Sequence, residues 1–190
     1  RAQPRPRVSA LNKVCDADSA GFGTSQLFMN PAWAPRDIPV ADSWKRSVDV
    51  VVAVGEHAEK MGVTLNIEQL QPYESNLVNT AADLRRFIDD VASPAMVCCL
   101  DIGAMAVAND TIEDFYREMP DKIHHVHFSD RNHEVPGDRD LPLASYIEQL
   151  NAKGYDGYLT LEVNDGMYVE DPHAAFARSA DAMRRLLGAP

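Results

Sequence analysis

Short apolar runs alternate with longer amphipathic segments from about residue 25 onward, an order typical of successive strand–helix units on a parallel sheet. Five runs have the length of strands, at residues 26–29, 63–68, 96–101, 123–127 and 158–162. Helices are expected between and after them, because apolar residues recur there at helical spacing. These helices should span residues 43–61, 80–91, 111–119, 142–153 and 171–187. Ser43 is the expected N-cap of the first helix and Thr80 of the second.

Four of the predicted strands end in an acidic residue or a histidine. Alternation in residues 63–68 places the apolar side chains on one face and Thr64, Asn66 and Glu68 on the other, so this strand finishes with a carboxylate on its polar face. The next three strands end in Asp101, His127 and Glu162. Since parallel strands point their C-terminal ends to the same edge of a sheet, we expect these four side chains to converge.

Three carboxylates and one imidazole gathered at one edge require a cation. This donor set favours a divalent metal, with Mn²⁺ first, Mg²⁺ and Co²⁺ close behind, and Zn²⁺ also able to fit. A single acidic residue at a strand end is expected to face solvent. Four such strand ends in register favour a metal site instead. His125 shares a face with His127 and is expected to support that ligand rather than to bind the metal. Cys98 and Cys99 are expected in the core.

The composition of the chain mainly argues against certain partners and classes of protein. The chain has 190 residues, 45% of them hydrophobic, and is expected to form one domain over residues 1–190 with an irregular stretch at 1–20. Eighteen Lys and Arg against 29 Asp and Glu give a net charge of −11, which disfavours nucleic acids and anionic membrane surfaces as partners. No apolar run approaches the roughly 18 to 20 residues of a membrane span. Three cysteines, two of them adjacent, imply no disulfide framework, so a cytoplasmic location is expected.

Several short motifs, in this order and spacing, resemble the sugar isomerase/epimerase superfamily with its xylose-isomerase-like TIM barrel. They are Ile67-Glu68, residues 72–76, Leu100-Asp101, residues 125–127, residues 135–137, and residues 154–158 leading to Glu162. The resemblance covers about residues 20–188 and is strongest to fructoselysine 3-epimerases and ketose 3-epimerases. It implies a (β/α)8 TIM barrel of which about five strand–helix units are present and the N-terminal strands are lacking. The chain is then a truncated piece, a piece completed by another chain, or a shortened relative.

The resemblance also implies roles for single residues. The four strand-end residues match the family's metal ligands. Glu74 matches a carboxylate that helps to hold the substrate, and His133 stands where relatives place a substrate-binding His or Arg. Two positions depart from the pattern: Ala104 stands where many members have His, and Arg139 replaces a usual Gly. Arg139 is expected either to alter its loop or to add a cation near the substrate. Trp33, in the loop after the first strand, is expected either to wall the substrate pocket or to pack on its own scaffold.

Epimerisation beside a ketone removes a carbon-bound proton and returns one to the opposite face. A metal would stabilise the resulting enediolate, and Glu68 and Glu162 are the expected acid/base groups, one on each face. The expected activity is C3 epimerisation of a ketose or fructosamine-type small molecule by a homo-oligomer. The alternatives are a dehydratase or C-glycoside lyase of the same superfamily, or a non-catalytic partner subunit. A DNA-repair endonuclease of this fold is disfavoured by the net charge and by too few His residues at strand ends.

Overall fold

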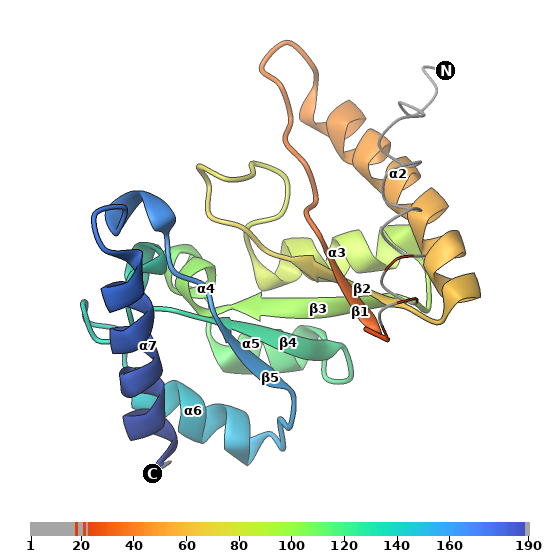
Figure 1. Cartoon of the computed structure of the whole chain (residues 1–190). Coiled ribbons are helices and arrows are strands. Elements are labelled where there is room, and N and C mark those ends of the chain that lie inside the picture. The colour runs from red at the N-terminus through yellow and green to blue at the C-terminus, as the bar shows by residue number, and fades with distance from the viewer. Residues whose placement is uncertain (1–17, 19–20, 22, 189–190) are drawn as a thin grey trace.

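Five parallel strands form the centre of the protein (Figure 1). The computed structural model describes residues 18, 21 and 23–188, so nearly all of the stretch 1–20 lies outside the described residues. The strands follow one another across the sheet in chain order. They are β1 (Gln26–Met29), β2 (Thr64–Glu68), β3 (Met96–Asp101), β4 (Ile123–Phe128) and β5 (Tyr158–Leu161). All five predicted strands are confirmed, with ends that shift by no more than one residue.

Helices connect the strands and pack as an outer layer on one side of the sheet (Figure 1). The five predicted helices are α2 (Val40–Met61), α3 (Ala81–Val91), α5 (Ile112–Glu118), α6 (Leu143–Ala152) and α7 (Pro172–Leu187). The short α4 (Ile102–Ala108) and the 3₁₀ turns η1 (Arg131–His133) and η2 (Asp165–Met167) were not predicted. Each longer helix contacts the next one in this series, which makes the outer layer continuous.

The helix starts confirm one predicted cap and correct another. Helix α2 begins at Val40 with Pro39 as its N-cap, and Ser43 lies buried inside the helix. Since the φ angle of proline is already fixed near the helical value, Pro39 can begin the helix without a capping side chain. At α3 the prediction is confirmed: Thr80 Oγ1 accepts a hydrogen bond from Asp83 N at 3.0 Å, and the Asp83 carboxylate accepts one from Thr80 N at 3.2 Å.

The two faces of the sheet differ in chemistry, as the alternation in β2 predicts. Leu65 and Ile67 are fully buried in the hydrophobic core between the sheet and the helices, together with Phe87 of α3. Asn66 and Glu68 lie on the opposite, inner face of the curled sheet and are buried there. Polar side chains are therefore collected on the inner face, away from the helix layer.

Strand β4 contains an extra residue that decides which of its side chains face inward. Its register with β3 skips His124, so the strand has a β-bulge at that exposed residue. Ile123 and Val126 are three positions apart, yet both join the hydrophobic core. A regular strand of the same length would place Ile123 on the face of His125 and His127. The bulge therefore lets the core residues and the two inner histidines occupy opposite faces.

The sheet is an open half of a barrel. Among the described residues, β1 pairs only with β2 and β5 only with β4. Side chains at these two edges are exposed, with Phe28 at 40% and Tyr158 at 75%. A curled, all-parallel sheet with a helix after each strand agrees with the predicted (β/α)8 fold in truncated form. Within residues 23–188, no helix has the length and apolarity needed to cross a membrane.

Candidate metal and active site

Four side chains from the C-terminal ends of neighbouring strands come together on the inner face. Glu68 ends β2, Asp101 ends β3, His127 lies near the end of β4, and Glu162 follows β5 directly. One ligand atom of each lies within 4.8 Å of those of the other three. The structure thus brings together the four residues that the strand pattern singled out, since parallel pairing aligns these strand ends.

His127 is held between two carboxylates. Its Nδ1 lies 2.5 Å from Glu68 Oε1 and 2.8 Å from Glu162 Oε2. Burial lowers the pKa of His127, but the contacts and charges of Glu162 and Glu68 outweigh burial and raise that pKa to about 10. Burial is the main cause that raises the pKa of Glu68 to about 7. For Glu162, burial is outweighed by His127 and then His133, so its pKa is lowered.

Two buried carboxylate oxygens of this group, Asp101 Oδ2 and Glu162 Oε2, make no well-aligned hydrogen bond. Their neighbours are histidine nitrogens: His133 Nε2 lies 3.3 Å from Asp101 Oδ2, and His127 Nδ1 lies 2.8 Å from Glu162 Oε2. Nδ1 of His127 carries at most one proton, and its shorter contact with Glu68 uses it. Asp101 Oδ1 accepts from the backbone N–H of Ala104 at the start of α4, which aims Oδ2 at the cluster. Buried carboxylate oxygens whose hydrogen bonding is incomplete, beside an imidazole, match the donor set of a divalent cation.

A second layer of polar side chains adjoins the four residues. His133 Nε2 lies 3.3 Å from Asp101 Oδ2, and His133 Nδ1 lies 3.6 Å from Glu74 Oε1. Burial lowers the pKa of His133, but Asp101, followed by Glu162 and Glu74, raises it to about 9. Burial also raises the pKa of Glu74. The structure therefore places Glu74 and His133, two of the four residues expected to bind substrate, beside the cluster.

Two glutamines of the β2–α3 loop belong to this layer and were missed by the sequence reasoning. Gln71 is 1% exposed, and its Nε2 lies 3.0 Å from the Tyr73 hydroxyl and 3.4 Å from Nε2 of His133. Gln69 Nε2 donates to the backbone carbonyl of Asp101 at 2.7 Å. Their only sequence signal is that they lie one and three residues after Glu68, since no local periodicity marks a loop residue as buried.

Aromatic rings cover one side of His127. Phe28 of β1 stacks on His127 with ring centroids 4.9 Å apart and meets His125 edge-on at 4.8 Å. His125 is buried beside His127, with centroids 5.5 Å apart, and its Nε2 lies 2.7 Å from Thr160 Oγ1. His125 thus touches the ring of His127 without offering an atom to the four-residue group. The sequence reasoning did not single out Phe28.

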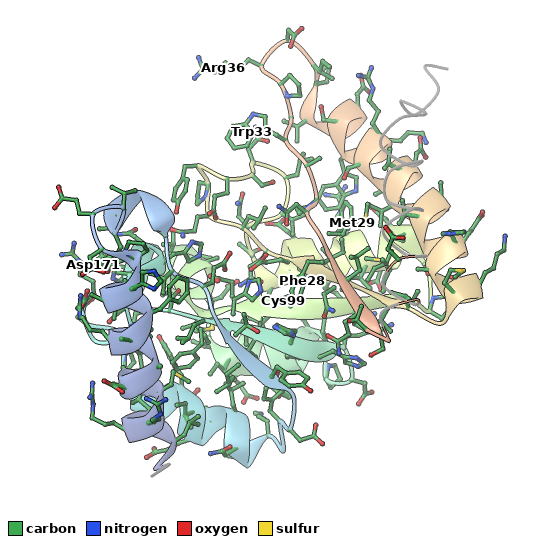
Figure 2. The ribbon with its side chains drawn as sticks, viewed as in Figure 1. Phe28, Met29, Trp33, Arg36, Cys99 and Asp171 are labelled. Atoms are coloured by element: carbon green, nitrogen blue, oxygen red, sulfur yellow. The ribbon has the colours of Figure 1, made fainter. Side chains whose placement is uncertain are left out.

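Trp33 lies in the loop after β1, and Arg139 lies in the loop after β4. Trp33 stands on the extended segment between β1 and α2 (Figure 2) and is 46% exposed. Asn76 holds this segment, because its Oδ1 accepts from Ala34 N at 2.7 Å and its Nδ2 donates to Ala34 O at 3.0 Å. Arg139 Nε donates to the buried carboxylate of Glu134 at 2.8 Å. The part that either residue plays toward a substrate stays a prediction.

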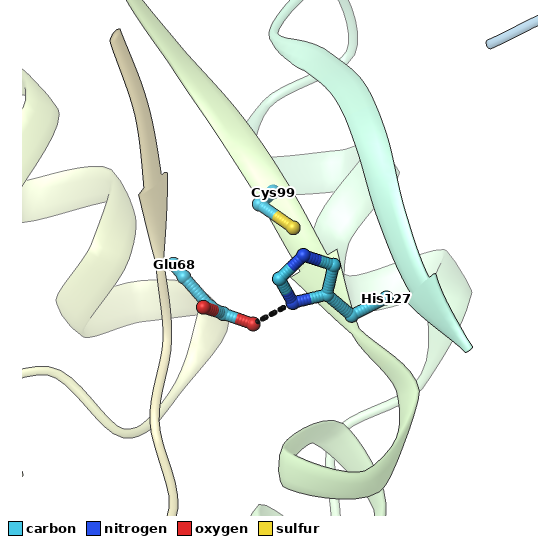
Figure 3. A group of neighbouring side chains, drawn as sticks. All are labelled: Glu68, Cys99 and His127. Carbon is cyan, nitrogen blue, oxygen red and sulfur yellow. Dashed lines mark hydrogen bonds and ion pairs between the residues drawn. The ribbon is translucent and has the colours of Figure 1, made fainter. Parts of the chain in front are cut away.

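The two adjacent cysteines have different surroundings. Cys98 packs in the hydrophobic core, as expected. Cys99 is also buried, but it faces the site: its sulfur, a Glu68 oxygen and a His127 nitrogen all lie within 4.8 Å of one another (Figure 3). Burial raises the pKa of both thiols well above the usual value, so neither carries a thiolate at neutral pH in the metal-free protein.

The chain is similar in sequence to known sugar epimerases. It is 31% identical over 149 residues to the fructoselysine 3-epimerase of Escherichia coli and 33% identical over 150 residues to the L-ribulose 3-epimerase of Mesorhizobium japonicum. These matches cover 76% and 79% of this chain, but 54% and 47% of the relatives. The chain thus spans about half the length of the curated relatives it matches.

Solved structures of sugar epimerases share the fold. A D-psicose 3-epimerase from Clostridium cellulolyticum, crystallised with D-tagatose, has a TM-score of 0.81 at 22% identity, covering 99% of this chain and 73% of that one. An L-ribulose 3-epimerase has a TM-score of 0.81 at 25% identity, covering 95% and 67%. Residues 13–186 match the model of a protein family, and with this match the chain belongs to the xylose isomerase-like TIM barrel family.

Proposed function

We propose that this protein is a divalent-metal-dependent sugar epimerase that inverts C3 of a ketose or a fructosamine-type sugar. One observation carries the proposal: Glu68, Asp101, His127 and Glu162 share a cluster in which two buried carboxylate oxygens make no well-aligned hydrogen bond. The relatives named above are sugar 3-epimerases, which supports the reaction class. Because the chain spans about half of each relative, the activity is proposed for the whole protein.

The four clustered residues would hold the ion, with Mn²⁺ favoured because three of them offer hard oxygen donors. A bound divalent ion would supply Lewis-acid stabilisation of the negative charge that develops when the sugar loses a carbon-bound proton. Glu68 and Glu162 extend from β2 and β5, with β3 and β4 between them. A sugar bound between them would present opposite faces of its C3 carbon to the two carboxylates.

The two glutamates stand on opposite sides of the proposed sugar position, which suits a transfer of one proton on each face. In the metal-free protein burial raises the pKa of Glu68 to about 7, whereas for Glu162 burial is outweighed by His127 and His133, which lower its pKa. A bound divalent ion would lower both pKa values, so both carboxylates would be ionised in the loaded site. Glu162 would then accept the C3 proton, and a proton taken up by Glu68 would return to the opposite face. The reverse epimerisation exchanges these roles, because the proton then leaves from the side of Glu68.

The neighbouring layer is suited to hold the sugar. His133, with its pKa raised to about 9, is protonated at neutral pH and can donate to a substrate oxygen. Glu74 can accept from a sugar hydroxyl, and its Oε2 is positioned by the backbone N–H of Gln71 at 3.0 Å. Trp33 and Arg139 complete the proposed substrate-binding set. Cys98 and Cys99, both free, fit a reducing compartment such as the cytoplasm.

The test is deuterium incorporation at C3. The longest expressible form of the protein is incubated with Mn²⁺ and a panel of ketoses and fructosamines in D₂O and followed by NMR. Glu68→Gln and Glu162→Gln should each abolish incorporation, whereas Glu148→Gln, on the exposed face of α6, should retain it. Full activity in either site variant would refute the two-glutamate mechanism. A product of changed mass would favour the dehydratase or lyase, and failure to bind metal would favour a non-catalytic subunit.

A further inference from the structure

A thiol lies beside the proposed metal site and takes no part in the mechanism above. Cys99 faces the inner side of β3, two residues before Asp101, and is fully buried. Its sulfur forms a compact group with a Glu68 oxygen and a His127 nitrogen, all within 4.8 Å of one another. Figure 3 shows the sulfur next to the imidazole nitrogen that does not carry the hydrogen bond to Glu68. Carboxylate, thiolate and imidazole are the three ligand types that bind Zn²⁺ in proteins.

We propose that Glu68, Cys99 and His127 form a second metal position, overlapping the first, that takes thiophilic divalent ions such as Cd²⁺ and Zn²⁺. The inference rests on the proposed function, since Glu68 and His127 also belong to the four-residue site. A soft sulfur ligand favours soft or borderline ions, whereas the oxygen-rich set with Asp101 and Glu162 favours hard ions. A hard ion therefore occupies the strand ends, and a thiophilic ion lies deeper along β3.

The two positions would not be filled together. Both use Glu68 and His127, so two divalent ions held there would lie close to one another and repel. An ion at the inner position leaves Asp101 Oδ2 and Glu162 Oε2 uncoordinated, whereas an ion at the strand ends would bind both oxygens. Binding at the inner position also requires the Cys99 thiol to release its proton to solvent. Mn²⁺ has little affinity for sulfur and thus binds only at the strand ends. Cd²⁺ binds at the inner position, and Mn²⁺ is then released from the protein.

The experiment is a Cd²⁺ titration of the full chain, followed through the ultraviolet charge-transfer band of a cadmium–thiolate bond. The wild type should develop this band and saturate it at one ion per chain. Cys99→Ala should lose the band and bind Cd²⁺ at least about tenfold more weakly, since even outer partners of metal ligands change affinity by roughly 10–100-fold. Cys98→Ala, on the core side of the same strand, and Cys15→Ala should both keep the band.

A parallel Mn²⁺ titration separates this inference from the proposed function. Free Mn²⁺ is measured by its electron paramagnetic resonance signal. Mn²⁺ should bind wild type and Cys99→Ala with affinities within about twofold, and Cd²⁺ should release it from the wild type. Cadmium NMR of the wild type gives a second readout if Cys99→Ala does not fold. Mn²⁺ binding without any cadmium–thiolate signal would overturn the second position alone. Absence of Mn²⁺ binding would overturn the proposed metal-dependent function itself.

Discussion

Replacing Asp101 with Asn should lower the pKa of His133 in the metal-free protein. The two side chains approach at 3.3 Å between Oδ2 and Nε2. Burial alone lowers the pKa of His133, and Asp101 is the largest of the groups that raise it to about 9, ahead of Glu162 and Glu74. Asn keeps the shape of the side chain, and its carbonyl oxygen can still accept from Ala104 N. The substitution therefore removes the charge and leaves the cap of α4 in place.

The size of the effect can be worked out from the raised pKa of His133. A pKa change from 6.5 to about 9 corresponds to about 3 kcal/mol of favourable interaction with protonated His133, at roughly 1.4 kcal/mol per pH unit. With its main partner uncharged, His133 should titrate near pH ~7 or below. The free energy of unfolding of the wild type should therefore depend on pH. Protonated His133 stabilises the folded protein fully below pH 6.5, and this contribution is lost as the pH rises through about 9. The Asp101→Asn variant should lack most of this pH dependence of stability between pH 6.5 and about 9.

The assay is an NMR titration of the histidine ring protons after treatment with a chelator. Asp49→Asn serves as the matched control, because Asp49 pairs with Lys45 on the exposed surface of α2. The control should leave the His133 titration unchanged. A His133 ring that still titrates near pH 9 in Asp101→Asn would show that Asp101 is not the source of its raised pKa.

Gly103→Ala should raise the KM for the sugar several-fold, because the added Cβ would lie 3.2 Å from Cδ2 of His133 and 3.3 Å from Asp101 Oδ1. Gly55→Ala on α2, where the added Cβ would lie 3.0 Å from Ser93 Oγ and far from the site, should leave KM unchanged. Thr80→Ala should lower the free energy of unfolding by about 1 kcal/mol in urea denaturation, since Asp83 N loses the Thr80 hydroxyl as its acceptor, whereas the bond from the backbone N–H of residue 80 to the Asp83 carboxylate remains. Mn²⁺ at about a hundred times its Kd should stabilise the protein by about 2.7 kcal/mol, a Tm rise of roughly 5–10 °C that EDTA reverses. Equal KM values, equal unfolding midpoints or an unchanged Tm would contradict the respective argument.

The strands and the convergence of their ends could be predicted because both depend on local sequence and one topological rule. Each apolar run of the right length became a strand, and the parallel order then brought Glu68, Asp101 and His127 to one edge. Helix starts were less predictable, because a Pro whose φ suits a helix start competes with a nearby Ser. Pro39 therefore begins α2, and Ser43 lies inside it.

The layer around the four residues could not be predicted, because it depends on contacts between distant segments. Gln71 and His133 are 62 positions apart in the chain, and only the folded sheet brings the β2–α3 loop against η1. Phe28 lies within a predicted strand, but its stacking on His127 follows from the curvature of the sheet between β1 and β4. Cys99 was assigned to the core by its apolar neighbours, although alternation with Cys98 turns it to the inner face.

The bulge in β4 gives this strand a place where its length can change without moving the site. If His124 were absent, Ile123 and Val126 would be two positions apart, and ordinary alternation would keep both in the core and His127 on the inner face. Gly157 makes room both for the longer form and for the Tyr155 ring, since a Cβ there would lie 2.9 Å from the carbonyl oxygen of His124 and 2.5 Å from the Tyr155 hydroxyl. Homologous sequences should therefore tolerate a one-residue gap at this point, and those that keep the extra residue should also keep glycine at the position facing it.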